Sequence, residues 1–330
     1  MAAPATARND EASLAVRAAW LHYVGGLKQS AVAEKLGVTS IKAHRLIMRA
    51  NQDGAVKFII DGEISECVSL ENKISERYGL DYCEVVPNVN ADDIPLGVLG
   101  VAGAKFLQRE IFSGENDLIG LGHGRTLASC VSQLPKLDAQ KTQFVSLLGG
   151  LNRNFSANPH DVMHRLAEKT GADAFVMPVP FFANSAEDRE ILLSQRGVAD
   201  VLVMAARSQL KLVGIGTVDP SAQLVESGMI APNEISEVIQ AGAAGELLGH
   251  FFNQDGQHVE TNLSSRTVSV ELADIGNSRI VAVAGGNNKT RAIGSVLMSG
   301  LLKGLITDER TANELINLEF SKNTGRKINA

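Results

Sequence analysis

The sequence predicts two domains: an all-α helix-turn-helix domain ending in a β-wing, then an α/β domain with a mostly parallel sheet. In the N-terminal part, two short helical patterns are joined by a tight turn. Beyond it, short apolar strands alternate with amphipathic helices. The chain has 330 residues, enough for two separate cores. We expect the first domain at 1–60, the second at 61–322 and a polar tail at 323–330.

The N-terminal pattern begins with a predicted helix over 11–23 and continues with helices over 29–36 and 40–51, joined by Gly37-Val38-Thr39. The last of these should contribute apolar contacts through Ile41, Leu46 and Met48. An apolar run at 55–60 predicts the wing strand. A basic helix of this size fits the DNA major groove. The candidate DNA-binding residues are Gln29, Ser30, Ser40, Lys42, His44, Arg45 and Arg49.

The net charge of −6 conceals an asymmetry between the two expected domains. Residues 1–60 hold eight of the 31 Lys and Arg but only four of the 37 Asp and Glu, so they carry +4 and the remainder −10. A basic head on an acidic body suits a protein whose first domain alone contacts phosphate backbone. A merely solvated basic surface would have the same composition.

Composition also argues against several classes of protein. No apolar run approaches the roughly 18 residues of a membrane span, and the N-terminus has no signal-peptide core. The three cysteines are odd in number and widely spaced, which favours reduced thiols in a cytoplasmic protein. Aromatic residues make up only 5% of the chain, which disfavours binding of single strands by stacking.

The second domain is predicted from alternating elements. A parallel sheet covered by helices follows from this order. The expected helices span 66–78, 97–109, 125–133 and 159–170, and the expected strands 83–86, 118–121, 144–148, 174–179, 201–205, 212–215 and 280–284.

Several of the predicted strands end in glycine-rich loops. The first contains Gly122, Gly124, Arg125 and Thr126, where backbone amides and a helix N-terminus could bind an anion. It is neither the dinucleotide fingerprint nor a P-loop, because the third glycine comes one position early and no Gly-Lys-Ser/Thr follows. A strand-to-helix turn without a ligand is the alternative.

Three further loops have the same character. Loops at the carboxyl ends of parallel strands meet in one crevice, and together these favour a phosphorylated small molecule. Their candidate ligand-binding residues are Gly149, Gly150 and Asn152, then Gly216 and Thr217, then Lys289.

Catalytic and metal-binding patterns are weak. His160 and His164 have the spacing of a zinc pair on one helix face, but Asp161 stands where a metalloprotease needs Glu, and no third ligand is evident. We expect no metal site and no cofactor. The acidic run at 187–190 is expected to be a solvated helix start. Glu246 or Asp219 could act as a base if the protein were an enzyme.

With these motifs in order, the chain resembles the SorC family of bacterial sugar-responsive transcription regulators over about residues 14–316. The resemblance lies in pieces that are modest alone and specific in their order and spacing. They are Gly37-Val38-Thr39 with His44-Arg45-Leu46, the loop 122–127, Leu148-Gly149-Gly150, Pro178-Val179-Pro180, Val213-Gly214-Ile215-Gly216, 242–246, Ala284-Gly285-Gly286, Lys289 and 305–309.

The resemblance implies a Rossmann-like second domain with the fold of sugar-phosphate isomerases, which binds a phosphorylated sugar or polyol. The family's phosphate-binding threonine loop falls on Arg125 and Thr126, a polar effector contact on Asn158, and a phosphate-contacting lysine on Lys289. Family members form homodimers or homotetramers on palindromic double-stranded operator DNA.

This chain also departs from the family pattern. The recognition helix has Thr39-Ser40-Ile41-Lys42-Ala43 where Ser-Arg-Pro-Thr-Val is common, so the operator sequence cannot be transferred. Gln209 stands where an acid is usual, and Glu246 replaces a frequent Asp. Both changes bear on which ligand is accepted, and Glu246 is among the expected effector-binding residues.

The leading hypothesis is therefore a DNA-binding regulator, a repressor of a carbohydrate or polyol catabolic operon, and not an enzyme. The alternative is a sugar-phosphate isomerase or lyase with an appended helical domain, since a fold does not fix a function. A third possibility keeps the helix-turn-helix as a protein-interaction module, which the basic second helix disfavours.

Overall fold

The computed structural model describes residues 5–56, 65–88, 94–139, 141–152, 158, 160–275 and 278–318. The chain divides into two compact units, residues 1–62 and 63–330, and each is described here by itself. No helix within these described ranges is long and apolar enough to cross a membrane.

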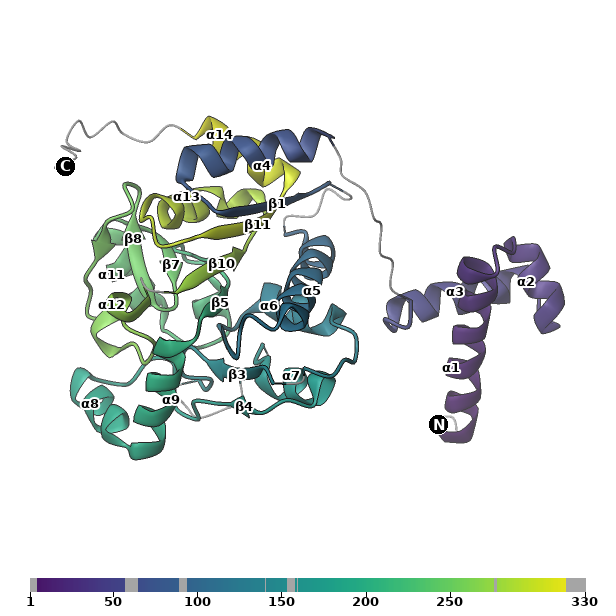
Figure 1. Cartoon of the computed structure of the whole chain (residues 1–330), viewed down its shortest axis with the longest axis horizontal. Helices are drawn as coiled ribbons and strands as arrows, with labels where there is room; N and C mark the ends of the chain where they lie inside the picture. Colours follow the sequence, from purple (N-terminus) through teal and green to yellow (C-terminus); the bar gives the residue numbers. More distant parts are fainter. Residues whose placement is uncertain are drawn as a thin grey trace. The chain divides into compact units, whose positions relative to one another are not determined.

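The first unit is helical (Figure 1). It contains α1 (Ala5–Ala19), a π-helical turn η1 (Trp20–Val24), α2 (Gln29–Leu36) and α3 (Ser40–Gln52). Gly37 ends α2 with φ +62°, a conformation that favours glycine. Thr39 begins α3, because its side chain accepts a hydrogen bond from the Lys42 amide. The predicted helix-turn-helix is thus present.

Alanines make up most of the core of this unit, and their small side chains let the helices cross closely. In α3 the buried face is Ala43, Leu46, Ile47 and Ala50. The predicted core contacts of Ile41 and Met48 are wrong, because these side chains are 75% and 42% exposed. Of the predicted wing strand at 55–60, the first two residues are in no strand, and the rest lies outside the described residues.

The second unit is built on a seven-stranded parallel sheet with the order β1-β11-β10-β5-β2-β3-β4. From β2 the chain moves outward through β3 and β4, whereas β5, β10 and β11 lie on the other side. The order therefore reverses between the neighbouring strands β2 and β5. The strands are β1 (Tyr82–Val86), β2 (Leu118–Leu121), β3 (Gln143–Ser146), β4 (Ala174–Phe175), β5 (Leu210–Val213), β10 (Arg279–Val283) and β11 (Gly304–Asp308).

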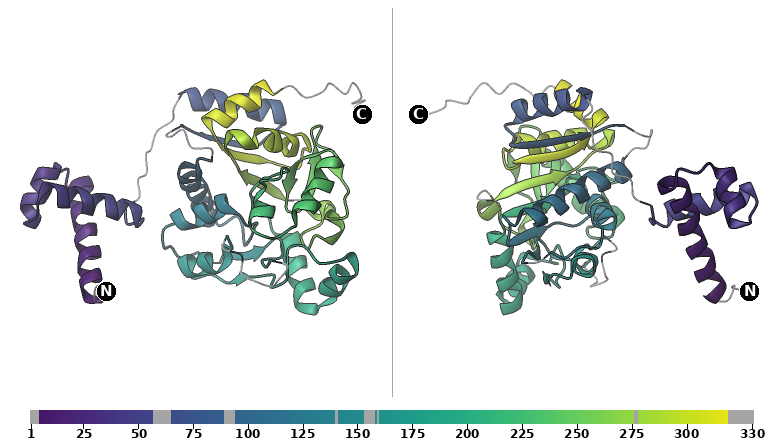
Figure 2. Two further views of the ribbon diagram at one scale, coloured as in Figure 1. Left: turned by 180° about the vertical axis from the view of Figure 1, so that it is seen from behind. Right: turned by 45° about the vertical axis from the view of Figure 1, so that its right-hand side comes forward.

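Both faces of the sheet are buried, as expected for parallel strands. Alternate residues of one strand enter different cores: Val281 and Val283 pack in one, Ile280 and Ala282 in the other. The first core is covered by α5 (Leu96–Ser113), α6 (Arg125–Gln133) and α7 (Met163–Thr170). Helices α5 and α6 pack directly on each other (Figure 2).

The second core lies under α4 (Ser65–Tyr78), α13 (Thr290–Met298) and α14 (Glu309–Asn317). It also lies under a four-stranded antiparallel sheet, β6-β7-β8-β9, that the sequence did not predict. These strands are β6 (Gly216–Thr217), β7 (Ala243–Leu247), β8 (His250–Asn253) and β9 (His258–Val259). The remaining elements are α8 (Ala186–Ser194), α9 (Arg196–Arg207), α10 (Gln223–Glu226), α11 (Pro232–Gln240), α12 (Leu272–Ile275), η2 (Ser264–Arg266) and η3 (Asn287–Lys289).

Most predicted elements of this unit are confirmed, and three are corrected. The predicted strand at 174–179 is limited to the two residues of β4. The predicted strand at 201–205 is wrong, because the segment lies inside α9; apolar residues at 198, 201, 202 and 205 follow helical spacing. The predicted helix at 159–170 begins only at Met163. The acidic run at 187–190 does start a helix, which Ser185 caps. The predicted tail at 323–330 lies outside the described residues.

Candidate functional site

A pocket lies where the order of the parallel sheet reverses. The loops after β2 and β5 both line it, as expected for a ligand crevice in an open α/β sheet. Residues from η3, α10 and the antiparallel sheet complete it. The lining consists of Ile94, Leu96, Gly122, His123, Gly124, Arg125, Thr126, Leu127, Leu148, Asn158, His160, Phe181, Gly214, Ile215, Gly216, Thr217, Gln223, Leu224, Ser227, Met229, Glu246, Leu248 and Lys289.

The N-terminus of α6 opens into this pocket. Gly124 precedes the helix with φ +121°, a conformation that L side chains rarely adopt, and no side chain caps the helix. The backbone hydrogen bonds of the helix begin with the Ala128 amide, which donates to the Gly124 carbonyl at 2.9 Å. The amides of Arg125, Thr126 and Leu127, in the first turn, are therefore left to serve an anion.

Lys289 brings a second cation to the same pocket. Its Nζ donates to the Ile215 carbonyl at 2.8 Å. Burial and the nearby Arg125 charge lower the pKa of Lys289 to about 8, although Glu246 and Asp219 act in the opposite direction. Two cations placed this close repel each other without a ligand, and a bound dianion would relieve that repulsion.

Glu246 lies in β7 opposite Gly216. Its Oε1 accepts a hydrogen bond from the Gly249 amide at 2.5 Å, and a Cβ atom at position 216 would lie 2.1 Å from its Oε2. Gly216 is thus required for the carboxyl group to occupy this place. Burial raises the pKa of Glu246 to about 7, against the opposing effects of the Gly249 amide and Lys289.

This raised pKa predicts a pH effect on stability. The unfolded chain ionises Glu246 near pH 4.5, while the folded chain holds its proton until about pH 7. Stability should therefore fall as pH rises through this window, by up to about 3 kcal/mol. Glu246→Gln should remove that loss, as measured by urea unfolding at pH 4.5 and 7.5. The exposed Glu237→Gln is the matched control, and parallel pH profiles for all three proteins would contradict the assignment.

Asp219 adds a negative charge beside Lys289. Burial disfavours its ionised form, but hydrogen bonds from Ser221 and Thr217 outweigh that effect and leave the pKa of Asp219 below its usual value. The Ser221 amide and hydroxyl donate to Oδ1 at 2.8 and 2.6 Å. Asp219 therefore stays ionised and helps to keep Lys289 protonated.

Two histidines outside the expected effector-binding set, His123 and His160, also line the pocket. The edge of His123 meets Phe181, with ring centroids 5.1 Å apart. Burial and the charge of His160 lower the pKa of His123 to about 4, so it is neutral at pH 7. Burial and Arg125 lower the pKa of His160 as well. Within the described residues, neither His123 Nδ1 nor Asn158 Nδ2 has a hydrogen-bond partner, so both can serve a ligand hydroxyl.

Nine of the twelve expected effector-binding residues line this pocket: Gly122, Gly124, Arg125, Thr126, Asn158, Gly216, Thr217, Glu246 and Lys289. Gly149, Gly150 and Asn152 do not. The Gly149 and Gly150 amides donate to the carbonyls of Val268 and Met177, and so cannot bind an anion. Their neighbour Leu148 supplies an apolar wall instead.

Sequence reasoning missed His123, His160, Gln223 and Ser227. His123 could have been found, because it lies inside the first glycine loop. Gln223 and Ser227 have no motif and reach the pocket only because α10 folds over it. His160 and His164 do not share a helix face, since α7 begins after His160. The described residues contain no cluster of three or more His, Cys, Asp or Glu that could hold a metal.

Six of the seven candidate DNA-binding residues lie in the first halves of α2 and α3, and Arg49 lies in the last turn of α3. Gln29, Ser30, Ser40, Lys42, His44 and Arg45 are exposed. Gln29 Nε2 and His44 Nδ1 lie 3.1 Å apart, so the two helices share a polar contact. Arg49 is half-buried and pairs with Glu11 at 2.8 Å and Asp53 at 3.4 Å. Arg49 is therefore less available to DNA than Arg45.

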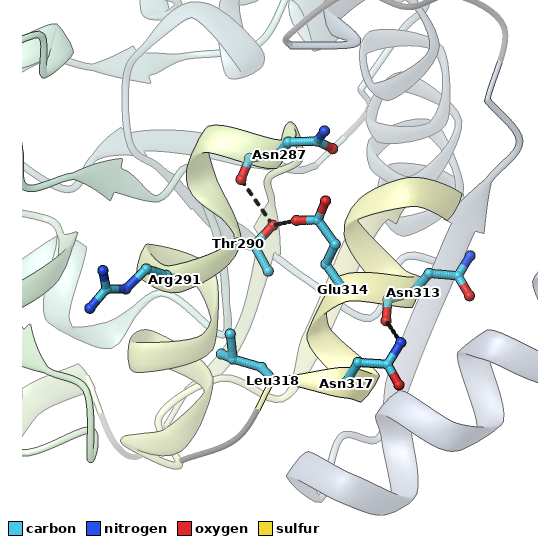
Figure 3. Close-up of a pocket in the computed structure, with 7 residues that line it drawn as sticks. All are labelled: Asn287, Thr290, Arg291, Asn313, Glu314, Asn317 and Leu318. Atoms are coloured by element: carbon cyan, nitrogen blue, oxygen red, sulfur yellow. Dashed lines mark hydrogen bonds between the residues drawn. The ribbon is translucent and has the colours of Figure 1, made fainter. Parts of the chain in front are cut away.

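A second pocket lies between α13 and α14 (Figure 3). The Thr290 hydroxyl donates to Glu314, and Arg291 points away from that carboxylate. The rest of the lining is Asn287, Asn313, Asn317 and Leu318. Its one cation, Arg291, is balanced by the carboxylate of Glu314, so this lining carries no net positive charge, unlike the pair of cations in the first pocket.

The chain is similar in sequence and in fold to proteins that are named as transcription regulators. The profile of the family described as "Putative sugar-binding domain" matches residues 62–317. The erythritol catabolism regulatory protein EryD of Brucella abortus is 60% identical over 304 residues, 92% of this chain and 96% of EryD. Transcriptional regulator LsrR of Klebsiella pneumoniae is 31% identical, over 93% of this chain and 94% of LsrR.

A solved structure has the same fold over most of the chain. The full-length sorbitol operon regulator SorC from Klebsiella pneumoniae superposes with a TM-score of 0.67 and 24% identity. The match covers 93% of this chain and 99% of SorC.

Proposed function

This chain belongs to the SorC family of sugar-binding transcriptional regulators, and we propose that it represses a polyol catabolic operon under control of a phosphorylated polyol or sugar. The observation that carries the proposal is the composition of the pocket. It joins an anion-binding end, formed by α6, Arg125 and Lys289, to polar groups suited to hydroxyls.

The effector we propose is a four-carbon polyol or ketose phosphate. Its phosphate would accept hydrogen bonds from the first-turn amides of α6 and from Arg125 and Lys289. Its hydroxyls would meet Asn158, His123 and Glu246, a carboxyl that accepts hydrogen bonds and, in its protonated form, also donates one. Support for four carbons comes from the 60% identity with a protein named for erythritol catabolism.

Operator binding is assigned to α3. The helix holds Lys42, Arg45 and Arg49 and no acidic residue, which suits the phosphate-lined major groove. We propose that two copies place their α3 helices on the halves of a palindrome, as a homodimer or homotetramer. The alternative of an isomerase or lyase is disfavoured, because EryD, LsrR and SorC are each named as regulators.

The test is a DNA-binding titration against the upstream region of the regulated genes, at fixed salt, with a panel of tetritol and tetrulose phosphates. Arg45→Ala should weaken operator binding at least tenfold while effector affinity is unchanged. Lys73→Ala, an equal charge change at an exposed position of α4 in the second unit, is the control. Equal operator affinity for wild type and Arg45→Ala would overturn the assignment of α3.

A further inference from the structure

Helix α3 carries an aliphatic side chain in water at its second residue. Ile41 is 75% exposed, the highest value among the large apolar side chains of the described residues. The backbone around Ile41 is fixed at the start of α3, because the Thr39 side chain accepts a hydrogen bond from the amide of Lys42, the next residue.

Packing in the core of the first unit does not account for an isoleucine at position 41. The buried face of α3 is Ala43, Leu46, Ile47 and Ala50, and Ile41 is absent from the cluster that these residues form. Met48, seven positions on and 42% exposed, follows on the same side of the helix. An isoleucine here contributes little to folding, since its apolar surface stays in water.

The charges around Ile41 indicate what covers it. Ser40, Lys42, His44 and Arg45 are exposed beside it, and α3 contains no acidic residue. The covering surface is therefore polyanionic and must also offer an apolar group. In the major groove that group is the C5-methyl of thymine, the one apolar feature among the base edges.

We infer that Ile41 contacts the C5-methyl of a thymine in each operator half-site and selects that base. The inference rests on the proposed operator binding of α3. It also assigns separate tasks along the helix: Arg45, one turn further on, serves the phosphates or a guanine edge. His44 is held by Gln29, 3.1 Å away, and is less free to contact bases.

The experiment uses the full chain and the shortest upstream duplex that it binds with sequence preference. Each thymine of the duplex is replaced singly by uracil, which removes the methyl group and keeps the base pair. Wild type should bind about three- to fivefold more weakly when one particular thymine per half-site is changed. Ile41→Ala should show that same loss on the unmodified duplex and no further loss with uracil there.

Controls separate this contact from other effects. Met48→Ala, the other exposed apolar change on α3, should remain sensitive to uracil at that position. The salt dependence of binding should be unchanged in Ile41→Ala, since no phosphate contact is lost. In Arg45→Ala a shallower salt dependence would place Arg45 on a phosphate, and an unchanged one on a guanine edge. Ile41→Val, which keeps part of the contact, should fall between wild type and Ile41→Ala.

Two results would overturn the inference: a uracil scan that affects wild type and Ile41→Ala equally at every position, or one that affects neither. A wild-type protein that prefers no duplex would instead overturn the proposed function itself. The two failures are thus distinguishable.

Discussion

Replacing Lys289 by methionine is expected to weaken binding of the phosphorylated effector by about 10- to 150-fold, because a charge-assisted hydrogen bond contributes roughly 1.5–3 kcal/mol. The effector-free protein should be no less stable. Burial and Arg125 lower the pKa of Lys289 to about 8, so holding an ammonium there costs free energy until an anion binds. The variant should still bind its operator but no longer respond to the effector.

Calorimetric titration with a tetrulose phosphate gives the affinity, and thermal unfolding without ligand gives the stability. Arg291→Met is the matched control, since Arg291 is exposed and does not line this pocket. Unchanged effector affinity in Lys289→Met would place the phosphate elsewhere. A large fall in Tm without ligand would instead make Lys289 a structural residue through its bond to Ile215.

Replacing Arg266 by methionine is expected to lower the free energy of unfolding of the second unit by about 3–5 kcal/mol. Arg266 and Glu234 are each only 8% exposed and form an ion pair, and Arg266 also donates to the carbonyls of Asn262 and Asn184. Glu234 in turn accepts from the Ala231 amide at the start of α11. The variant leaves a carboxylate buried without its guanidinium partner.

Urea unfolding of the full chain measures this loss. The double variant Arg266→Met with Glu234→Leu should recover part of it, because a buried ion pair costs desolvation that an apolar pair avoids. Arg291→Met again supplies an exposed arginine as control. A loss below 1 kcal/mol for Arg266→Met would show that water or other groups replace the guanidinium.

Several features were predictable because their signals are local. Helix α6 begins and ends where predicted, since Gly124 precedes it and its apolar residues keep helical spacing. The turn at Gly37 and the Thr39 cap likewise depend on a few adjacent residues. The prediction of a strand at 201–205 was wrong because a short apolar run fits either a strand or a buried helix. Strands of two residues, such as β6 and β9, have no detectable period.

The sequence by itself determined which chemistry the chain carries: glycines and cations at strand ends, and a basic helix after a capped turn. Such features depend on backbone conformations and side-chain types that neighbouring residues specify. Only the tertiary structure decided which loops meet. Strand pairing places β2 beside β5, which brings Arg125 to Lys289 and Glu246. Separate contacts with Val268 and Met177 commit the Gly149 and Gly150 amides to other carbonyls. Contacts between residues more than a hundred positions apart leave no periodic pattern in the chain, so packing alone reveals them.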